Sequence, residues 1–252
     1  MMHEKRGRSR DPEAARAAFL SAAEAIFARA GFEGARVEEI AAQAGYNKAL
    51  LFHYFGDKLG LYQAVVTRHC EQVAAGNARV FGPVVPSDDA PLTRDSVRRF
   101  LEIAVRWSFD FCRNRPMCAR VLSWEAAEGW TTFRRINANR EQSPWVEAVQ
   151  RFLLRARDAG LLRADLDPRM LVAIVMGMTQ HYHLSLPRYE LMFADADLMT
   201  PEALAHAREQ MVQFVVRGAM TDATGAVDET DESQKTQEAT QTEGKQFDAV
   251  GI

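Results

Sequence analysis

Residues 37–55 read VEEIAAQAGYNKALLFHYF, two short helical patterns separated by a glycine. The apolar residues of the first pattern recur at spacings of three and four, which predicts a two-turn helix over residues 37–44 that ends at Gly45. Asn47 is a natural N-cap for a second helix over residues 48–55. That second helix carries more aromatic surface than one core-facing stripe can bury, so part of it must point away from the core.

Two short helices joined by a tight turn that contains glycine are typical of the helix-turn-helix, whose second helix enters the major groove of DNA. On a helix over residues 48–55, Leu51 and Phe55 lie four residues apart and share one face. We therefore expect these two side chains to anchor the helix in its core.

The other face of this helix has groups suited to DNA. Lys48 suits a phosphate or a guanine, and the small Ala49 permits close approach to the groove. Leu50 can pack on a thymine methyl group, while His53 and Tyr54 supply hydrogen-bonding tips. These residue types favour an interface with double-stranded DNA.

Helical periodicity continues on both sides of this motif, and sustained strand alternation is missing from the sequence. Asp11 and Pro12 predict the start of a first helix that Gly31 stops, and Asp57 caps a fourth helix that begins at residue 58. Residues 81–93 read as a loop. Further helices are expected at about 94–114, 116–128, 132 or 144 to 160, 168–186 and 201–219.

The composition is that of a soluble globular protein, with 47% apolar and 26% charged residues in a chain of 252. The sequence contains no run of 18 apolar residues and no apolar run behind its basic N-terminus, so we expect neither a membrane span nor a signal peptide. Cys70, Cys112 and Cys118 lack metal-ligand spacing and favour a reducing cytosol. A thiol redox sensor is the alternative to buried or idle cysteines.

The net charge of −3 hides an asymmetry along the chain. Residues 1–11 are rich in Lys and Arg and predict a flexible basic arm that reaches phosphates, with a solvated frayed terminus as the alternative. Residues 219–252 carry a net charge of −6 and almost no apolar content, which predicts a disordered acidic tail.

Several landmarks occur in register between Arg16 and Val66: an AA…IF…GF pattern, VEEIA at 37–41, AG at 44–45, LFHYF at 51–55 and DK at 57–58. With these landmarks the stretch closely resembles the TetR family of bacterial transcriptional regulators. The resemblance implies an all-α fold of about nine helices, in which a three-helix DNA-binding head precedes a larger helical effector-binding and dimerisation domain. We expect the head at residues 12–70, with its motif at about 36–55, and the larger domain at 71–218.

Transferred to this sequence, the resemblance implies a set of DNA contacts on the recognition helix and at the start of the next helix. The set is Lys48, Ala49, Leu50, Phe52, His53, Tyr54 and Lys58. Family members often have Gly-Thr where Ala49 and Leu50 stand, and Tyr where Phe52 stands. We therefore expect an operator sequence of its own for this protein. Ala35 and Arg36 replace the usual Thr that opens the preceding helix, which leaves that cap unexplained.

The resemblance further implies a homodimer that binds a near-palindromic operator in the bacterial cytoplasm, acts as a repressor and is released by a small effector. No cofactor and no metal are expected. An enzyme is disfavoured because the sequence lacks a phosphate-binding glycine loop, a His/Glu metal motif and a GxSxG elbow. The alternative is an all-helical ligand-binding or adaptor protein whose head no longer binds DNA specifically.

An effector pocket is suggested by the clustering of nine of the 23 aromatic residues between Phe100 and Phe152. The candidate lining residues are Trp107, Phe111, Arg120, Trp124, Glu125 and Trp130. Such a pocket favours an apolar or aromatic effector. Ordinary packing of aromatic side chains in a core is the alternative.

Residues 171–178, LVAIVMGM, are apolar on every side of a helix and could form a four-helix dimer interface with the last helix. The candidate interface residues are Leu171, Val175, Met178, Met211 and Phe214. Burial within one protomer is the competing account. His181 and His183 are two residues apart and point to different sides of a helix, which argues against a shared metal ion.

Overall fold

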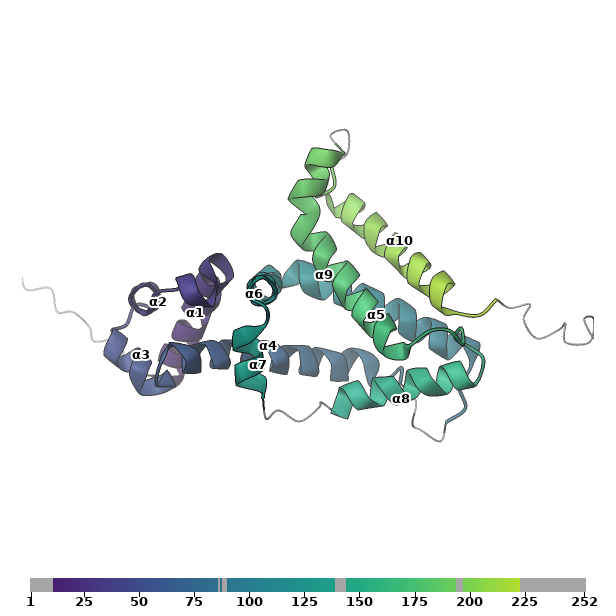
Figure 1. Cartoon of the computed structure of the whole chain (residues 1–252), viewed down its shortest axis with the longest axis horizontal. Helices are drawn as coiled ribbons and strands as arrows, with labels where there is room; N and C mark the ends of the chain where they lie inside the picture. The colour runs from purple at the N-terminus through teal and green to yellow at the C-terminus, as the bar shows by residue number, and fades with distance from the viewer. Residues whose placement is uncertain (1–10, 86, 88–89, 139–143, 194–196, 223–252) are drawn as a thin grey trace, which may run out of the picture.

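The computed structural model describes residues 11–85, 87, 90–138, 144–193 and 197–222, and these residues form α-helices with short connections (Figure 1). The helices are α1 (Pro12–Gly34), α2 (Val37–Ala44), α3 (Lys48–Phe55), α4 (Lys58–Phe81), α5 (Arg94–Asn114), α6 (Pro116–Ala127), α7 (Thr131–Asn137), α8 (Pro144–Asp158), α9 (Pro168–Met192) and α10 (Pro201–Ala219). The expected all-α fold is confirmed. Residues 1–10 of the basic arm and 223–252 of the acidic tail lie outside the described ranges.

Two differences from the expected helix pattern have simple causes. The described ranges hold ten helices instead of about nine, because residues 132 and 144 lie at or near the starts of two separate helices, α7 and α8. Helix α9 runs to Met192 and not to about 186, although Pro187 removes one hydrogen bond from its interior. Leu186 is buried beside that proline, so packing holds the helix together there.

Side-chain caps fix most of the helix starts. The Asn47 side chain accepts a hydrogen bond from the Leu50 N–H, and Asp57 accepts one from the Gly60 N–H at 2.7 Å. Asp11 caps α1 in the same way, so all three expected caps of the head are confirmed. Arg36 precedes α2 without a side-chain cap, as expected where no Ser or Thr stands.

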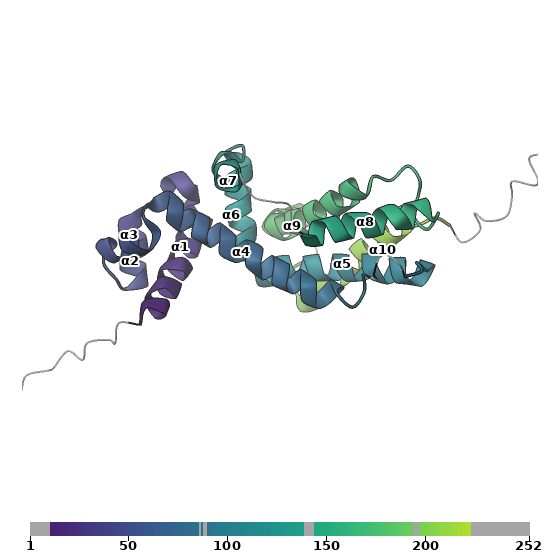
Figure 2. The same cartoon turned by 90° about the horizontal axis from the view of Figure 1, so that it is seen from below.

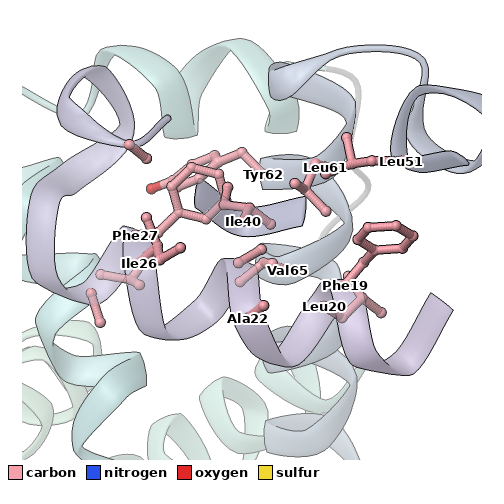
Figure 3. Close-up of a cluster of buried hydrophobic side chains, with 14 of the residues drawn as sticks. Phe19, Leu20, Ala22, Ile26, Phe27, Ile40, Leu51, Leu61, Tyr62 and Val65 are labelled. Carbon is pink, nitrogen blue, oxygen red and sulfur yellow. The ribbon is translucent and has the colours of Figure 1, made fainter. Parts of the chain in front are cut away.

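Helices α1 to α3 and the first half of α4 form the head around one apolar cluster (Figure 3). Phe19, Ile26, Phe27, Ile40, Leu51, Leu61 and Val65 are fully buried in it. Leu51 is thereby confirmed as a core anchor of α3. Phe55 is half-buried, and the centre of its ring lies 6.2 Å from the centre of the Phe19 ring. At about 25 cal/mol per Å² of apolar surface removed from water, these side chains supply most of the head's stabilisation.

The body forms a second apolar cluster, and α4 is continuous between the two (Figure 2). Leu61 and Tyr62 at the start of α4 belong to the head, whereas Phe81 at its end packs on Phe100 of α5. Helix α5 in turn packs against α9 and α10. The head is therefore attached to the body by an unbroken helix, without an intervening loop.

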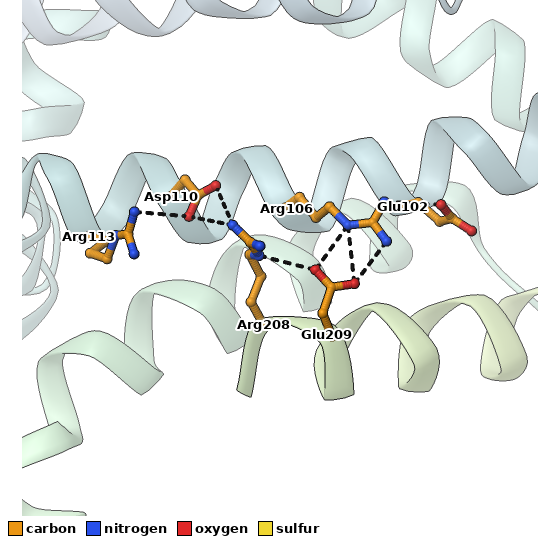
Figure 4. Close-up of polar contacts among 6 residues, drawn as sticks. All are labelled: Glu102, Arg106, Asp110, Arg113, Arg208 and Glu209. Carbon is orange, nitrogen blue, oxygen red and sulfur yellow. Dashed lines mark hydrogen bonds and ion pairs between the residues drawn. The ribbon is translucent and has the colours of Figure 1, made fainter. Parts of the chain in front are cut away.

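A network of ion pairs joins α5 to α10 (Figure 4). Arg106 pairs with Glu209 at 2.8 Å and with Glu102 at 3.0 Å, and Arg208 pairs with Asp110 at 2.9 Å. The hydrogen bonds from Arg106 hold the pKa of Glu209 below its usual value, and the same bonds raise the pKa of Arg106. The paired side chains are partly exposed, so the network contributes modestly to stability.

We expect Glu209→Gln to lower the free energy of unfolding by about 0.5–1 kcal/mol at pH 7, because it removes the negative charge that pairs with Arg106. The folded-state pKa of Glu209 is depressed, so its contribution is present above its ordinary pKa of 4.5 and is lost as the pH falls through the folded-state value. Denaturant unfolding at fixed protein concentration, followed by circular dichroism, measures both effects. Glu71→Gln on the exposed side of α4 is the control, and an equal loss in both variants contradicts the prediction.

Candidate nucleic-acid interface

Helices α2 and α3 are joined by a turn that requires glycine. Gly45 has a φ of 77° in the left-handed region and donates its N–H to the end of α2. The Asn47 side-chain oxygen then lies 2.8 Å from the Leu50 nitrogen and starts α3. The helix-turn-helix expected from the sequence is present, and its turn and cap are made by the residues expected for them.

Helix α3 divides its side chains between the head core and the surface, and two side chains expected on the outward face lie between the two. Leu51 points inward, whereas Lys48, Ala49, Phe52 and His53 are exposed. The other two predicted contact residues of this helix, Leu50 and Tyr54, are half-buried and pack on the rim of the head core. The structure therefore leaves a continuous exposed strip from the first turn of α3 to its last.

Two predicted contact residues have partners within the head. The Lys48 ammonium group is ion-paired with the Glu38 carboxylate of α2 and lies 5.3 Å from the centre of the Phe52 ring. Lys58 donates to the Glu33 carbonyl oxygen at 3.1 Å, at the end of α1, and lies over the Phe32 ring. The Glu33 carbonyl oxygen takes one of the three N–H donors of the Lys58 ammonium group.

The contact residues expected from the sequence lie on α3 and at Lys58, and they do not include cations that other helices place on the head. Arg16 of α1 is exposed and lies 5.7 Å from the centre of the Phe55 ring. Arg36 is exposed at the start of α2. An open groove of about 560 Å³ runs beside Arg16 and Tyr54 and is bordered by α4. The position of Arg16 in the first turns of α1 was the available signal, because helix N-termini favour phosphate.

The predicted effector residues lie in two different packing clusters. Trp107 stacks on Phe111 at 5.2 Å and packs on Phe81, within the body cluster. Trp124 and Glu125 instead lie where α6 meets the head: the Trp124 indole N–H donates to the Ala28 carbonyl oxygen at 3.2 Å. Two of the residues expected to line a common pocket, Trp124 and Glu125, are therefore bonded to the head instead.

The other predicted pocket residues lie near the surface. Arg120 is exposed on α6. Trp130 is 37% exposed, and the centre of its ring lies 5.5 Å from the centre of the Phe133 ring of α7. The sequence expectation of one aromatic pocket rested on closeness along the chain. Because α6 turns toward the head while α5 stays in the body, closeness along the chain does not become closeness in space.

Glu125 is a buried connector between helices. Its carboxylate accepts hydrogen bonds from the Tyr62 hydroxyl of α4 and from the Phe133 N–H of α7, and the residue is 1% exposed. Burial, together with this hydrogen bond, raises the pKa of Tyr62 far above its usual value. Glu125 therefore joins α4 of the head to α6 and α7 through one buried and one partly buried hydrogen bond.

The predicted dimer residues differ widely in exposure. Leu171 and Val175 pack in the core of the same protomer, which is the arrangement of the competing account. Met178 and Met211 are half-buried, and Phe214 is 70% exposed. The apolar side chains that remain exposed on α9 include Met170, Ile174 and Met176.

The histidines and cysteines weighed as metal or redox sites have ordinary structural surroundings at Cys112, Cys118, His181 and His183. Burial raises the pKa of the Cys118 thiol to about 12 and also raises that of Cys112, which disfavours reactive thiolates. A ring nitrogen of His183 lies 3.0 Å from the Phe109 carbonyl oxygen, and His181 contacts Ser185. Within the described ranges, no three His, Cys, Asp or Glu side chains are grouped so as to hold a metal ion. None of the described helices combines the length and the apolar character needed to cross a membrane.

The head and the body each match a family model. Residues 19–65 match the model described as bacterial regulatory proteins, tetR family, and residues 98–215 match the tetracyclin repressor-like C-terminal domain. The chain belongs to the TetR family. It is accordingly a transcriptional regulator with a helix-turn-helix DNA-binding head, as the sequence resemblance implied.

Named relatives agree with this assignment. The HTH-type transcriptional repressor SCO4008 of Streptomyces coelicolor is 33% identical over 134 residues, which span 53% of this chain and 61% of the repressor. The HTH-type transcriptional regulator RutR of Escherichia coli is 28% identical over 183 residues, or 73% of this chain and 80% of RutR. The structure of the ketosteroid transcriptional regulator KstR2 of Mycobacterium tuberculosis is similar in fold, with a TM-score of 0.57, 18% identity and coverage of 86% and 98%.

We expect Gly31→Ala to destabilise the protein by about 1–3 kcal/mol. Gly31 has φ 69° and ψ −179°, a conformation that essentially only glycine adopts. An added Cβ would also lie 3.0 Å from the Trp124 ring. Gly34→Ala in the same helix, where the added Cβ makes ordinary contact with Ala30, is the matched control. Thermal unfolding at one protein concentration compares the two, and an equal effect contradicts this role of Gly31.

Proposed function

We propose that this protein is a homodimeric repressor that binds a near-palindromic operator in the bacterial cytoplasm and is released by a small effector. The observation that carries the proposal is the exposed strip of α3, where the protomer buries Leu51 and leaves Lys48, Ala49, Phe52 and His53 uncovered. An exposed aromatic and cationic helix face beside a tight turn is suited to the major groove. SCO4008, a relative with one third of its aligned residues identical, is named a repressor.

The division of contacts on the DNA follows from exposure and chemistry. The start of α3 enters the groove, with Ala49 allowing close approach and Lys48 and Leu50 reaching base edges. Arg16, on the neighbouring α1, is placed to contact a phosphate on the rim of the groove, as is Tyr54 at the end of α3. Phe52 offers an apolar ring edge, whereas the Tyr that family members often have at this position would offer a hydroxyl group for a hydrogen bond. The operator preference is therefore particular to this chain.

Dimerisation is assigned to the exposed apolar sides of α9 and α10. Met170, Ile174 and Met176 on α9 and Phe214 on α10 are all more than 40% exposed in the protomer. Exposed large apolar side chains concentrated on two helices of a body domain mark a protein–protein contact. A two-fold dimer then sets the two recognition helices about one DNA turn apart, roughly 34 Å.

The route from effector to DNA passes through α6. The body extends over about residues 71–218 and the head over 12–70, so the boundary lies inside the continuous α4. Helix α6 contacts the head through Trp124 and Glu125. An effector that binds the body best when α6 is displaced therefore shifts the population toward heads that are out of register with the groove.

The proposal is tested with a duplex from the promoter region beside the protein's own gene. The protein should bind it more tightly than a random duplex of equal length, and log affinity should fall linearly with log salt. Equal affinity for both duplexes contradicts the proposal and favours the adaptor alternative. A thermal-shift screen of apolar and aromatic compounds, followed by release of the bound duplex, then identifies the effector.

Leu50→Thr should change which base is preferred at one position of each half-site, because a hydroxyl replaces an apolar group that suits a thymine methyl. The salt dependence should stay the same, since no charge is altered. A binding assay on operator variants with single base changes measures the preference. Leu154→Thr, at a 39% exposed position of α8, is the matched control and should change nothing. An unchanged base preference in Leu50→Thr contradicts this contact.

Phe214→Glu should shift the protein toward monomers, raising the dimer dissociation constant at least about tenfold, because a carboxylate would have to be buried in the contact. Operator affinity should fall with it, since both heads are needed for a two-fold site. Sedimentation over a range of concentrations gives the dissociation constant. Leu154→Glu is the control, and an unaltered dimer in Phe214→Glu rules out this surface.

A further inference from the structure

Lys48, the first residue of the recognition helix, is held by two neighbours in the head. Its ammonium group is ion-paired with Glu38, in the first turn of α2, and lies 5.3 Å from the centre of the Phe52 ring one turn along α3. The hydrogen bond from Lys48 is the main cause that lowers the pKa of Glu38, so the carboxylate is ionised at neutral pH. Both side chains remain well exposed, at 47% for Lys48 and 66% for Glu38.

The helix ends explain why this pair forms. A helix N-terminus carries a partial positive charge, so Lys48 at the start of α3 is disfavoured there, whereas Glu38 near the start of α2 is favoured. The tight turn at Gly45 brings these two helix starts within reach of one ion pair. Glu38 therefore offsets an unfavourable cation of the recognition helix.

We propose that Glu38 is a specificity-determining residue. Its carboxylate balances the charge of Lys48, which weakens binding to random DNA, and it orients the remaining N–H donors of Lys48 toward a base of the operator. The inference rests on the proposed function. A free ammonium group attracts any phosphate, which strengthens binding to every sequence. A paired ammonium has its charge largely balanced by the carboxylate, and the carboxylate itself repels phosphates.

Pairing leaves Lys48 able to read a base. An ammonium group has three N–H donors, and a single carboxylate contact leaves others available. The Phe52 ring and the Glu38 carboxylate fix the direction in which these donors point. A guanine edge at one position of the half-site can then accept from Lys48, whereas phosphates at other angles gain little.

The neighbouring residue of α2 supplies a matched control. Glu39 is also exposed in the first turn of α2, but it is ion-paired with Arg29 of α1 and not with the recognition helix. Glu38→Gln and Glu39→Gln therefore remove the same charge from the same helix end. Only Glu38→Gln releases a cation of the recognition helix, Lys48.

The experiment measures the affinities of the full-length protein for the operator duplex and for a random duplex over a range of salt concentrations. Wild type is compared with Glu38→Gln, Glu39→Gln, Lys48→Ala and the double variant Glu38→Gln/Lys48→Ala. We expect Glu38→Gln to raise the affinity for random DNA roughly three- to tenfold and to steepen the salt slope by about 0.9 for each new phosphate contact. Operator affinity should stay within about twofold, so the specificity ratio falls.

Two further results complete the test. Lys48→Ala should remove the effect of Glu38→Gln, because the released cation is then missing. Glu39→Gln should leave the specificity ratio within about twofold of wild type. Melting temperatures of all variants confirm that the head stays folded.

The outcomes separate this inference from the proposed function. A wild type that prefers its operator, with an unchanged ratio in Glu38→Gln or an effect that survives Lys48→Ala, contradicts only the role of Glu38. An equal fall of the ratio in Glu39→Gln contradicts it as well, because general loss of negative charge then explains the result. A wild type without any operator preference contradicts the proposed function and the role of Glu38 together.

Discussion

The buried carboxylate of Glu125 is the constraint on which the arrangement of head and body depends. A carboxyl group at 1% exposure is strongly destabilising unless it is hydrogen-bonded, and here the donors come from two other helices, Tyr62 of α4 and Phe133 of α7. Moving α6 relative to α4 would leave these groups unpaired in a dry environment. The junction consequently favours discrete arrangements over gradual bending, and the proposed release by an effector requires discrete arrangements of the head.

The indole of Trp124 strengthens the same junction in another way. It occupies space that exists only because Gly31 lacks a Cβ, and it also donates to a carbonyl group of α1. Head and body are thus joined in two ways, by the continuous helix α4 and by the lateral packing of α6 on α1 and α4. Two connections restrain the head far better than one, because a single helix can bend whereas a braced helix cannot do so without breaking the second contact.

Local signals in the sequence predicted the head almost completely, and they predicted the body only in outline. The Gly45 turn and the Asn47 cap depend on neighbours within a few residues, so capping rules were sufficient for them. The burial of Leu51 depends on α1 and α4 as well, but the apolar spacing within α3 already indicated which side chain faces the core. The pocket and dimer residues depend on which side of a helix meets which distant partner. Periodicity could not show that α6 leaves α5 for the head, nor that Leu171 and Val175 of an all-apolar helix face inward while Met170, Ile174 and Met176 face outward.

The ion pairs between α5 and α10 set the axial position of α10 as well as holding it in place. Charges alternate along α5 from Glu102 to Arg106 to Asp110, and α10 presents Arg208 and Glu209 to that series. A slide of α10 by one turn would bring Glu209 toward another carboxylate and Arg208 toward another guanidinium group, which like-charge repulsion opposes. The exposed Phe214 further along α10 is therefore held at a defined height on the body. In this way the alternating charges of α5 determine where along the body an apolar side chain of α10, Phe214, is presented.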